Sequence, residues 1–284
     1  MKQLTVISGK GGTGKTILTA SFAVLAKKKV MVDCDVDAAD LHLLLHPEVK
    51  ETHRFEEGEK AVIDQELCTE CGRCREVCRF DAIPEDYVVD PISCEGCWVC
   101  HYTCPEEAIR MEKNLCGEWY LSDTKYGPLV HARLGIAEEN SGKLVTLVKQ
   151  KAKELASSEN LDLVIIDGPP GIGCPVISSL AGVDLALVVT EPTISGSHDL
   201  ERVIGVAHHF RVKTAAVINR YDINPEVSAE IEDWCENRDV PVLGKIPFDR
   251  VVTEALVAGV PLIEYSQNGV SEKIESIWRS LILL

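Results

Sequence analysis

The stretch Gly9-Lys10-Gly11-Gly12-Thr13-Gly14-Lys15-Thr16 decides the fold. It follows a short apolar run at residues 4–8 that is typical of a buried strand, and it precedes a helical pattern over residues 15–28. Glycines here let successive backbone N–H groups turn toward a phosphate, and the start of the helix adds positive potential. Because a lysine and a hydroxyl at the end of such a loop contact phosphate oxygens and Mg²⁺, we expect these roles for Lys15 and Thr16.

The rest of the chain predicts an open α/β sheet around this loop. A second strand at residues 30–33 completes a strand–helix–strand unit, which indicates a parallel sheet. Further strands are expected at residues 161–167, 185–190, 214–219 and 242–246, with helices at 143–157, 198–209 and 225–238. The apolar stretch 274–284 is expected to be a closing helix packed on the sheet. Between residues 50 and 143 a cysteine-rich insertion shows none of this periodicity.

Charge separates the insertion from the remainder. The 284 residues carry a net charge of −16, which argues against nucleic-acid binding because phosphate contacts need clustered Lys and Arg. Residues 56–115 hold 15 acidic and 6 basic residues, a net of −9. We therefore predict a nucleotide domain formed by residues 1–55 and 116–284, and a separate inserted domain at residues 56–115.

The sequence predicts a cytoplasmic protein without a membrane partner. The opening apolar stretch is too short for a secretory signal, and no run approaches the roughly 18 apolar residues of a membrane span. The C-terminal stretch holds one basic residue, Arg279, whereas helices that lie on membranes usually have a basic face. Twelve cysteines in such a chain favour metal ligation over disulfides.

Eight of these cysteines form two runs with identical spacing: Cys68-x2-Cys71-x2-Cys74-x3-Cys78 and Cys94-x2-Cys97-x2-Cys100-x3-Cys104. Isolated pairs would leave zinc as an alternative. Two runs of four have instead the spacing of bacterial ferredoxins, in which the fourth cysteine of each run serves the other cluster. The insertion is thus expected to be a small α+β ferredoxin module with two [4Fe–4S] clusters. The first cluster would take Cys68, Cys71, Cys74 and Cys104, and the second Cys94, Cys97, Cys100 and Cys78.

Four cysteines lie outside these runs, at positions 34, 116, 174 and 235. Cys174 follows a predicted strand end and could suggest a further cluster ligand. A small buried residue is the simpler interpretation, because free cysteine behaves as a small apolar side chain.

Lys10, a second lysine early in the loop, resembles the deviant Walker A signature of the MinD/ParA/Mrp superfamily, which includes the nitrogenase iron protein. In that family the signature lysine contacts the nucleotide of the partner subunit in an ATP-sandwich dimer. The resemblance implies a P-loop ATPase with ATP and Mg²⁺ as ligands, bound by residues 9–16, and a homodimer in which Lys10 stabilises charge in trans. The alternative is a solvated loop lysine.

Two acidic strand ends resemble the switch segments of this family. Asp33-Cys34-Asp35-Val36-Asp37 is similar to switch I, which implies that Asp35 positions the attacking water, with Asp33 or Asp37 near the metal. Asp35 is also a candidate residue of the metal site, together with Thr16 and Asp167. Which of the three aspartates is essential stays open, since an aspartate at a strand end can also cap the next helix. Asp167 ends a hydrophobic strand like a Walker B motif, so the resemblance implies a role in holding Mg²⁺. Gly168 would sense the γ-phosphate through its N–H.

The base site is implied by two further matches. Asn219 and Arg220 end a strand similar to the one whose Asn reads adenine, and Pro247 lies in a loop that resembles the one packed against the base. With these residues the resemblance implies three catalytic side chains, Lys10, Lys15 and Asp35.

Three functions are compatible with a ferredoxin module between the two switch segments. The first is ATP-gated electron transfer through the clusters to a redox partner. The second is assembly of iron–sulfur or other metal cofactors on a partner. The third is a positioning ATPase, like MinD or ParA, with structural or sensing clusters, although the acidic charge argues against it.

Overall fold

The computed structural model describes residues 1–135, 138 and 141–284, and the chain divides into two compact units. The first unit comprises Met1–His53, Trp119–Arg133 and Ser141–Leu284. The second comprises Arg54–Glu118 and Leu134–Asn140. We describe each unit by itself.

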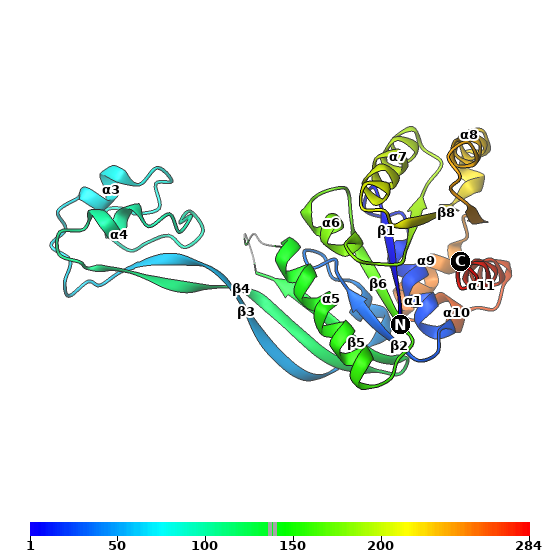
Figure 1. Ribbon diagram of the computed structural model, residues 1–284, viewed down its shortest axis with the longest axis horizontal. Coiled ribbons are helices and arrows are strands. Elements are labelled where there is room, and N and C mark those ends of the chain that lie inside the picture. Colours follow the sequence, from blue (N-terminus) through cyan, green and yellow to red (C-terminus); the bar gives the residue numbers. More distant parts are fainter. Residues whose placement is uncertain (136–137, 139–140) are drawn as a thin grey trace. The chain divides into compact units, whose positions relative to one another are not determined.

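A nine-stranded sheet with the strand order β3-β4-β5-β2-β6-β1-β7-β8-β9 organises the chain (Figure 1). Strands β1 and β2 pair in parallel with β6, β7 pairs in parallel with β1 and β8, and β8 with β9. The predicted mostly parallel α/β fold is confirmed. The strands are β1 (Lys2–Ser8), β2 (Lys29–Asp33), β3 (Glu48–Ile63), β4 (Ile109–Thr124), β5 (Gly127–Leu134), β6 (Leu163–Pro170), β7 (Leu185–Thr190), β8 (Lys213–Asn219) and β9 (Val242–Ile246).

Helices cover both faces of the sheet. On one face Leu4 and Val6 of β1 pack with Phe22 of α1, whose ring lies 4.9 Å from that of Trp278 in α11. Helices α5, α6 and α7 contact strands on the other face (Figure 1). The predicted closing helix is present as α11. The helices of the first unit are α1 (Lys15–Leu25), α2 (Leu41–Leu45), α5 (Ser141–Ser158), α6 (Cys174–Leu180), α7 (Ile194–His209), α8 (Pro225–Glu236), α9 (Arg250–Ala258), α10 (Leu262–Tyr265) and α11 (Gly269–Leu281), with a 3₁₀ turn η1 (Tyr221–Ile223).

Residues 50–143, which show none of the α/β periodicity, contribute more to the sheet than the sequence predicts, because β4, β5 and most of β3 lie there. Strand β5 pairs in parallel with β2, at Met31 and Leu129, and so extends the nucleotide sheet. Most side chains of β3 are exposed or half-buried, so the strand has no apolar run to reveal it. The two-residue turn at Lys125 and Tyr126 joins β4 to β5, which makes that pair an antiparallel hairpin.

The second unit is built from two similar halves around a small core of Ala61, Ile63, Cys74, Ile83, Tyr87 and Ile109. Each half holds one five-residue helix, α3 (Arg73–Val77) or α4 (Val99–Thr103). Each helix is preceded by a residue in the left-handed conformation, Gly72 or Trp98, and is followed by another, Asp81 or Glu107. The repeated cysteine spacing thus corresponds to a repeated backbone path. Among the helices that the structure describes, none is both long and apolar enough to span a bilayer.

Candidate functional site

The loop between β1 and α1 has the backbone that its glycines predict. Gly12 and Gly14 have φ angles of +79° and +91°, a region that residues with a Cβ rarely adopt. A Cβ on Gly14 would also lie 2.5 Å from Nδ2 of Asn219. The Thr13 hydroxyl is buried without a hydrogen-bond partner in the described chain. An orphaned polar atom inside this loop fits a site that a polar ligand completes.

Lys15 meets a cluster of carboxylates behind the loop. Its Nζ lies 2.9 Å from Oδ2 of Asp35. Burial by itself lowers the pKa of Lys15, but the carboxylates of Asp167, Asp35 and Asp33 outweigh burial and raise that pKa above its ordinary value. Burial, followed by the charge of Asp167, raises the pKa of Asp33 well above its usual range. Three carboxylates around one lysine leave an excess of negative charge that a divalent cation would balance.

Asp167 and Thr16, the residues predicted to hold Mg²⁺, lie in direct contact. Asp167, whose pKa is also raised by burial, accepts hydrogen bonds from the hydroxyls of Thr16 and Thr19 at 2.8 and 2.9 Å. Among the described residues no three His, Cys, Asp or Glu side chains converge on a single metal position. Mg²⁺ does not need such a cage, because it keeps several waters and takes one or two protein ligands beside the substrate phosphates.

The aspartates after β2 have different surroundings. Asp33 is buried, and its carboxylate accepts hydrogen bonds from the backbone N–H groups of Asp35 and Leu41. It therefore shapes the loop that leads to α2, as the capping alternative implied. Asp35 alone of the three is paired with Lys15, and Asp37 is exposed. Asp33 therefore holds the loop in place, whereas Asp35 faces Lys15.

Gly168 lies where β6 passes closest to β1. A Cβ at this position would come within 2.5 Å of Cγ2 of Ile7 and 3.0 Å of the Val6 carbonyl oxygen. Packing is therefore enough to require glycine at this position. That the Gly168 N–H senses the γ-phosphate stays a prediction.

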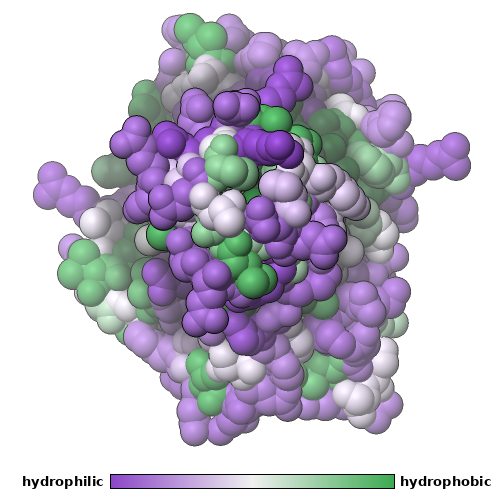
Figure 2. Space-filling model, turned by 90° about the vertical axis from the view of Figure 1, so that its left-hand side faces the viewer, coloured by the Kyte–Doolittle hydropathy of each residue, from purple (hydrophilic) through white to green (hydrophobic). Residues whose placement is uncertain are grey.

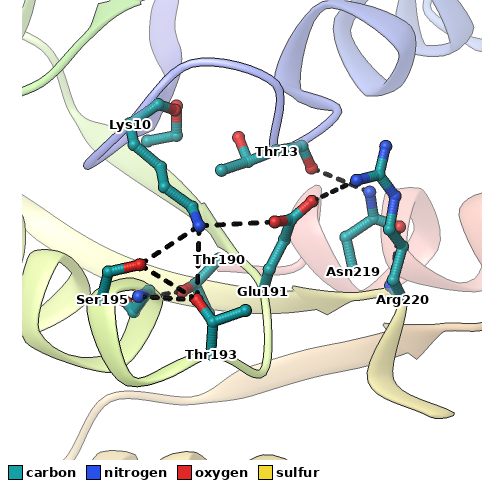
Figure 3. Close-up of polar contacts among 10 residues, drawn as sticks. Lys10, Thr13, Thr190, Glu191, Thr193, Ser195, Asn219 and Arg220 are labelled. Carbon is teal, nitrogen blue, oxygen red and sulfur yellow. Dashed lines mark hydrogen bonds and ion pairs between the residues drawn. The ribbon is translucent and has the colours of Figure 1, made fainter. Parts of the chain in front are cut away.

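Lys10 folds back onto its own subunit (Figure 3). Its Nζ lies 3.3 Å from the Thr193 hydroxyl, 3.4 Å from the Ser195 hydroxyl and 3.6 Å from Oε2 of Glu191. The other oxygen of Glu191 accepts a hydrogen bond of 2.6 Å from Arg220. The sequence does not predict Glu191, Thr193 or Ser195 as residues of the site. Their position directly after a predicted strand was the available signal, since ligand sites gather at the carboxyl ends of parallel strands.

The residues predicted for the base site lie at the ends of β8 and β9. The Asn219 side chain donates to the Thr13 carbonyl at 2.8 Å and accepts from the Arg220 N–H at 3.0 Å. Pro247 follows β9, and the next residue, Phe248, donates its N–H to Asp222 at 2.7 Å. This bond ties the loop of Pro247 to η1, close in sequence to Asn219. Adenine recognition by these residues stays a prediction.

The second unit contains two small cavities, each lined by four cysteines. One is lined by Cys68, Cys71, Cys74 and Cys104, and the other by Cys78, Cys94, Cys97 and Cys100. These are the two crossed sets expected from the spacing. Burial raises the pKa of Cys74, and raises that of Cys100 to about 11, so a thiolate there needs a nearby positive charge.

The remaining cysteines differ in exposure. Cys34, Cys116 and Cys235 are buried, as small apolar side chains usually are. The expectation of a buried Cys174 was wrong, because this residue is exposed at the start of α6.

Comparison with known proteins agrees with this geometry. The family described as CobQ/CobB/MinD/ParA nucleotide binding domain matches residues 4–262. An uncharacterized protein of Methanocaldococcus jannaschii, MJ0578, is 36% identical over 283 residues, which cover 98% of this chain and 96% of that protein. An iron–sulfur cluster carrier protein of Pyrococcus abyssi is 24% identical, over 99% of this chain and 85% of its own length.

Solved structures share the fold. The septum site-determining protein MinD of Pyrococcus horikoshii, complexed with Mg-ADP, aligns with a TM-score of 0.60 and 21% identity, over 99% of this chain and 95% of that one. The signature loop, the strand order and the matched length lead to one assignment. The chain belongs to the CobQ/CobB/MinD/ParA family of P-loop ATPases.

Proposed function

We propose that this cytoplasmic ATPase uses the nucleotide state of a homodimer to control electron transfer through two [4Fe–4S] clusters in the second unit. The observation that carries the proposal is the pair of cavities with crossed cysteine sets, Cys68, Cys71, Cys74 and Cys104 in one and Cys78, Cys94, Cys97 and Cys100 in the other. Such a cluster would supply one-electron transfer when bound.

The donor set and its arrangement fit this cofactor better than they fit zinc. A structural zinc ion draws four thiolates to about 2.3 Å from one point. The spacing in two runs of four, with four cysteines lining each of two cavities, supports a cluster instead. A [4Fe–4S] cluster takes its thiolates on separate irons, so the sulfurs stand around a volume instead of a point.

The nucleotide site would work as follows. The N–H groups of residues 9–16 hold the phosphates, Lys15 neutralises their oxygens, and Thr16 and Asp167 hold the metal. Asp35 leaves Lys15 when phosphate arrives, and its carboxylate then orients the attacking water. Lys10 reaches the nucleotide of the second subunit. Asn219, Arg220 and Pro247 form the base site.

The chain path supports a link between nucleotide and clusters. Asp33 ends β2 and Asp35 follows it, and β2 pairs directly with β5. The turn at Lys125 and Tyr126 joins the amino end of β5 to β4. At its carboxyl end β5 runs into the segment Leu134–Asn140, which belongs to the second unit. A movement of the loop after β2 would therefore act on a strand whose continuation enters the cluster-bearing unit.

The surface of the second unit supports a protein partner. Its large exposed apolar side chains include Phe80, Val99 and Tyr102, in a segment rich in acidic residues. Figure 2, which faces this unit, shows small hydrophobic patches between hydrophilic side chains. A protein with apolar contacts and a basic rim would match this surface.

Anaerobic reconstitution tests the clusters. We expect about eight irons and eight sulfides per chain, together with the absorbance and reduced-state EPR signals of two clusters. Cys104→Ser should remove one signal and Cys78→Ser the other, while Cys235→Ser, a change outside both cavities, should leave both. Zinc in place of iron, or one cluster at most, would contradict the assignment.

Gating needs a separate measurement. Reduced protein is mixed with an electron acceptor protein in the presence of ATP, ADP or no nucleotide, and oxidation is followed by absorbance. The proposal expects rates that depend on the nucleotide, and it expects this dependence to vanish in Lys15→Met. Equal rates in all states would refute gating while leaving the ATPase intact.

A second candidate is assembly of metal cofactors, which the likeness to the iron–sulfur cluster carrier protein favours. Here the clusters, or a bound metal, would be cargo. Isotope-labelled iron that moves from this protein to an apo-acceptor when ATP is added would favour assembly. Iron that never leaves would favour electron transfer.

The likeness to MinD similarly supports a positioning ATPase with structural clusters, which predicts function without cluster reduction.

A further inference from the structure

Glu191 places one carboxylate between two cations. It follows β7 and its side chain is 13% exposed. Arg220 holds Oε1 at 2.6 Å, and Lys10 lies 3.6 Å from Oε2 (Figure 3). Arg220 therefore makes a hydrogen-bonded ion pair, whereas Lys10 has only the weaker electrostatic contact.

The Lys10 ammonium has three polar neighbours, all on one segment of its own chain. Besides Glu191 these are the hydroxyls of Thr193 and Ser195, in the turn that begins α7. Thr193 is fixed, because its hydroxyl also accepts the N–H of Gly196 as the cap of that helix. Lys10 must leave all three partners before it can contact another molecule.

Arg220 connects the same carboxylate to the other end of the phosphate loop. Its N–H donates to the Asn219 side chain, which in turn donates to the carbonyl of Thr13. This chain of contacts thus starts and finishes in the phosphate loop. It runs from Thr13 through Asn219, Arg220 and Glu191 to Lys10. Arg220 itself has a φ of +53°, an unfavourable conformation for a residue with a Cβ, so its contacts must hold it there.

We propose that Glu191 is a positioning residue that holds Lys10 against its own subunit, and that Arg220 and Lys10 compete for its carboxylate. The proposal rests on the proposed function in one respect, namely that Lys10 acts across an ATP-dependent dimer. Arg220 takes most of the carboxylate's charge and leaves Lys10 weakly held and easily released.

The proposal predicts opposite effects of two substitutions. Glu191→Gln keeps the shape but removes the charge that holds Lys10, so the dimer should form at roughly fivefold lower protein concentration. Arg220→Met leaves the carboxylate to Lys10 alone, so the dimer should need roughly fivefold higher concentration. Glu201→Gln is the matched control, because Glu201 pairs with Arg238 at 3.8 Å on the exposed side of α7.

Sedimentation equilibrium at saturating non-hydrolysable ATP analogue and Mg²⁺ measures these dissociation constants on the full, cluster-loaded chain. Expected is a shift down for Glu191→Gln, a shift up for Arg220→Met, and no shift for Glu201→Gln. A purely structural role of Glu191 would weaken the dimer in both variants. If Glu191→Gln fails to fold, the direction of the Arg220→Met shift still decides: a tighter or unchanged dimer overturns the proposal.

If Lys10 does not act across an ATP-dependent dimer, the same measurements give a different result. If the unmodified protein forms no dimer with the analogue, or if Lys10→Met dimerises equally well, the trans role of Lys10 is wrong and the inference falls with it. If the unmodified protein dimerises, Lys10→Met does not, and Glu191→Gln matches the control, the inference alone is overturned.

Discussion

The charge balance around Lys15 gives a prediction in which two substitutions at one ion pair have unequal effects. Lys15, with 9% of its side chain exposed, is the cation that the described residues place against Asp33, Asp35 and Asp167. At 2.9 Å and an effective dielectric constant of about 20, its attraction to Asp35 amounts to about 6 kcal/mol before desolvation is subtracted. Lys15→Met removes this cation and leaves the carboxylates unbalanced, which typically costs about 3–5 kcal/mol of folding stability.

Asp35→Asn acts on the same pair with a different outcome. Lys15 keeps two carboxylates, and one like charge disappears, so we expect the free energy of unfolding to stay within about 1 kcal/mol of the unmodified protein. If Asp35 positions the attacking water, the variant still binds ATP but turns it over about 100-fold or more slowly.

Urea unfolding of the nucleotide-free protein, followed by Trp fluorescence, measures both changes. Mg-ATP binding and phosphate release are measured on the same preparations. If Asp35→Asn loses as much stability as Lys15→Met, then Asp35 is a necessary counter-ion and the argument from excess negative charge is wrong. If it hydrolyses ATP at the unmodified rate, the water-positioning role is wrong.

Three further predictions concern backbone and protonation. Gly14→Ala should abolish ATP binding, measured by calorimetry, because φ is +91° and the new Cβ would meet Asn219 at 2.5 Å. Gly96→Ala should destabilise the second unit by more than about 1 kcal/mol and lower its iron content, because its Cβ would lie 2.1 Å from the Glu59 carbonyl oxygen. Burial, with a smaller contribution from the charge of His42, lowers the pKa of His131 to about 4. The unfolded chain therefore binds the proton first, and stability falls by up to about 3 kcal/mol between pH 6.5 and 4, a slope that His131→Gln should flatten in urea titrations.

The last two of these have a matched control. Gly58→Ala has the same sign of φ, +71°, but meets no atom within 4 Å, so it separates backbone strain from collision at Gly96. His209→Gln removes an exposed histidine and should leave the pH slope unchanged. An unaltered slope in His131→Gln, or equal losses in the two glycine variants of the second unit, would contradict the reasoning.

The phosphate loop and Asp167 could be predicted because each is marked by a short sequence pattern. Lys15 and Thr16 stand in a fixed pattern next to an apolar strand, and Asp167 ends another such strand. The cysteine sets were predictable for the same reason, since spacing alone distinguishes a run of four from scattered pairs. In both cases the pattern is visible in short stretches of sequence, although Asp167 and the fourth cysteine of each set come from elsewhere in the chain.

The rest depends on tertiary context. Strand β3 is largely exposed and strongly polar, so its pairing with β4 leaves no pattern that sequence periodicity detects. The chain leaves the first unit at the end of β5, where Leu134 is assigned to the second unit, and no residue there signals that. Glu191 is an ordinary acidic residue until the fold brings Lys10 and Arg220 to it from opposite directions.

The crossed cysteine sets make the two halves of the second unit interdependent. Cys104 comes from the second half but lines the first cavity, and Cys78 does the reverse. Neither half alone supplies the four cysteines that line a cavity, so a fragment cut between the repeats keeps neither cavity complete. Damage to one cysteine run is shared between both cavities. The repeat pattern is that of a duplicated ancestor, but its present form resembles a reciprocal dimer whose subunits have been joined into one chain.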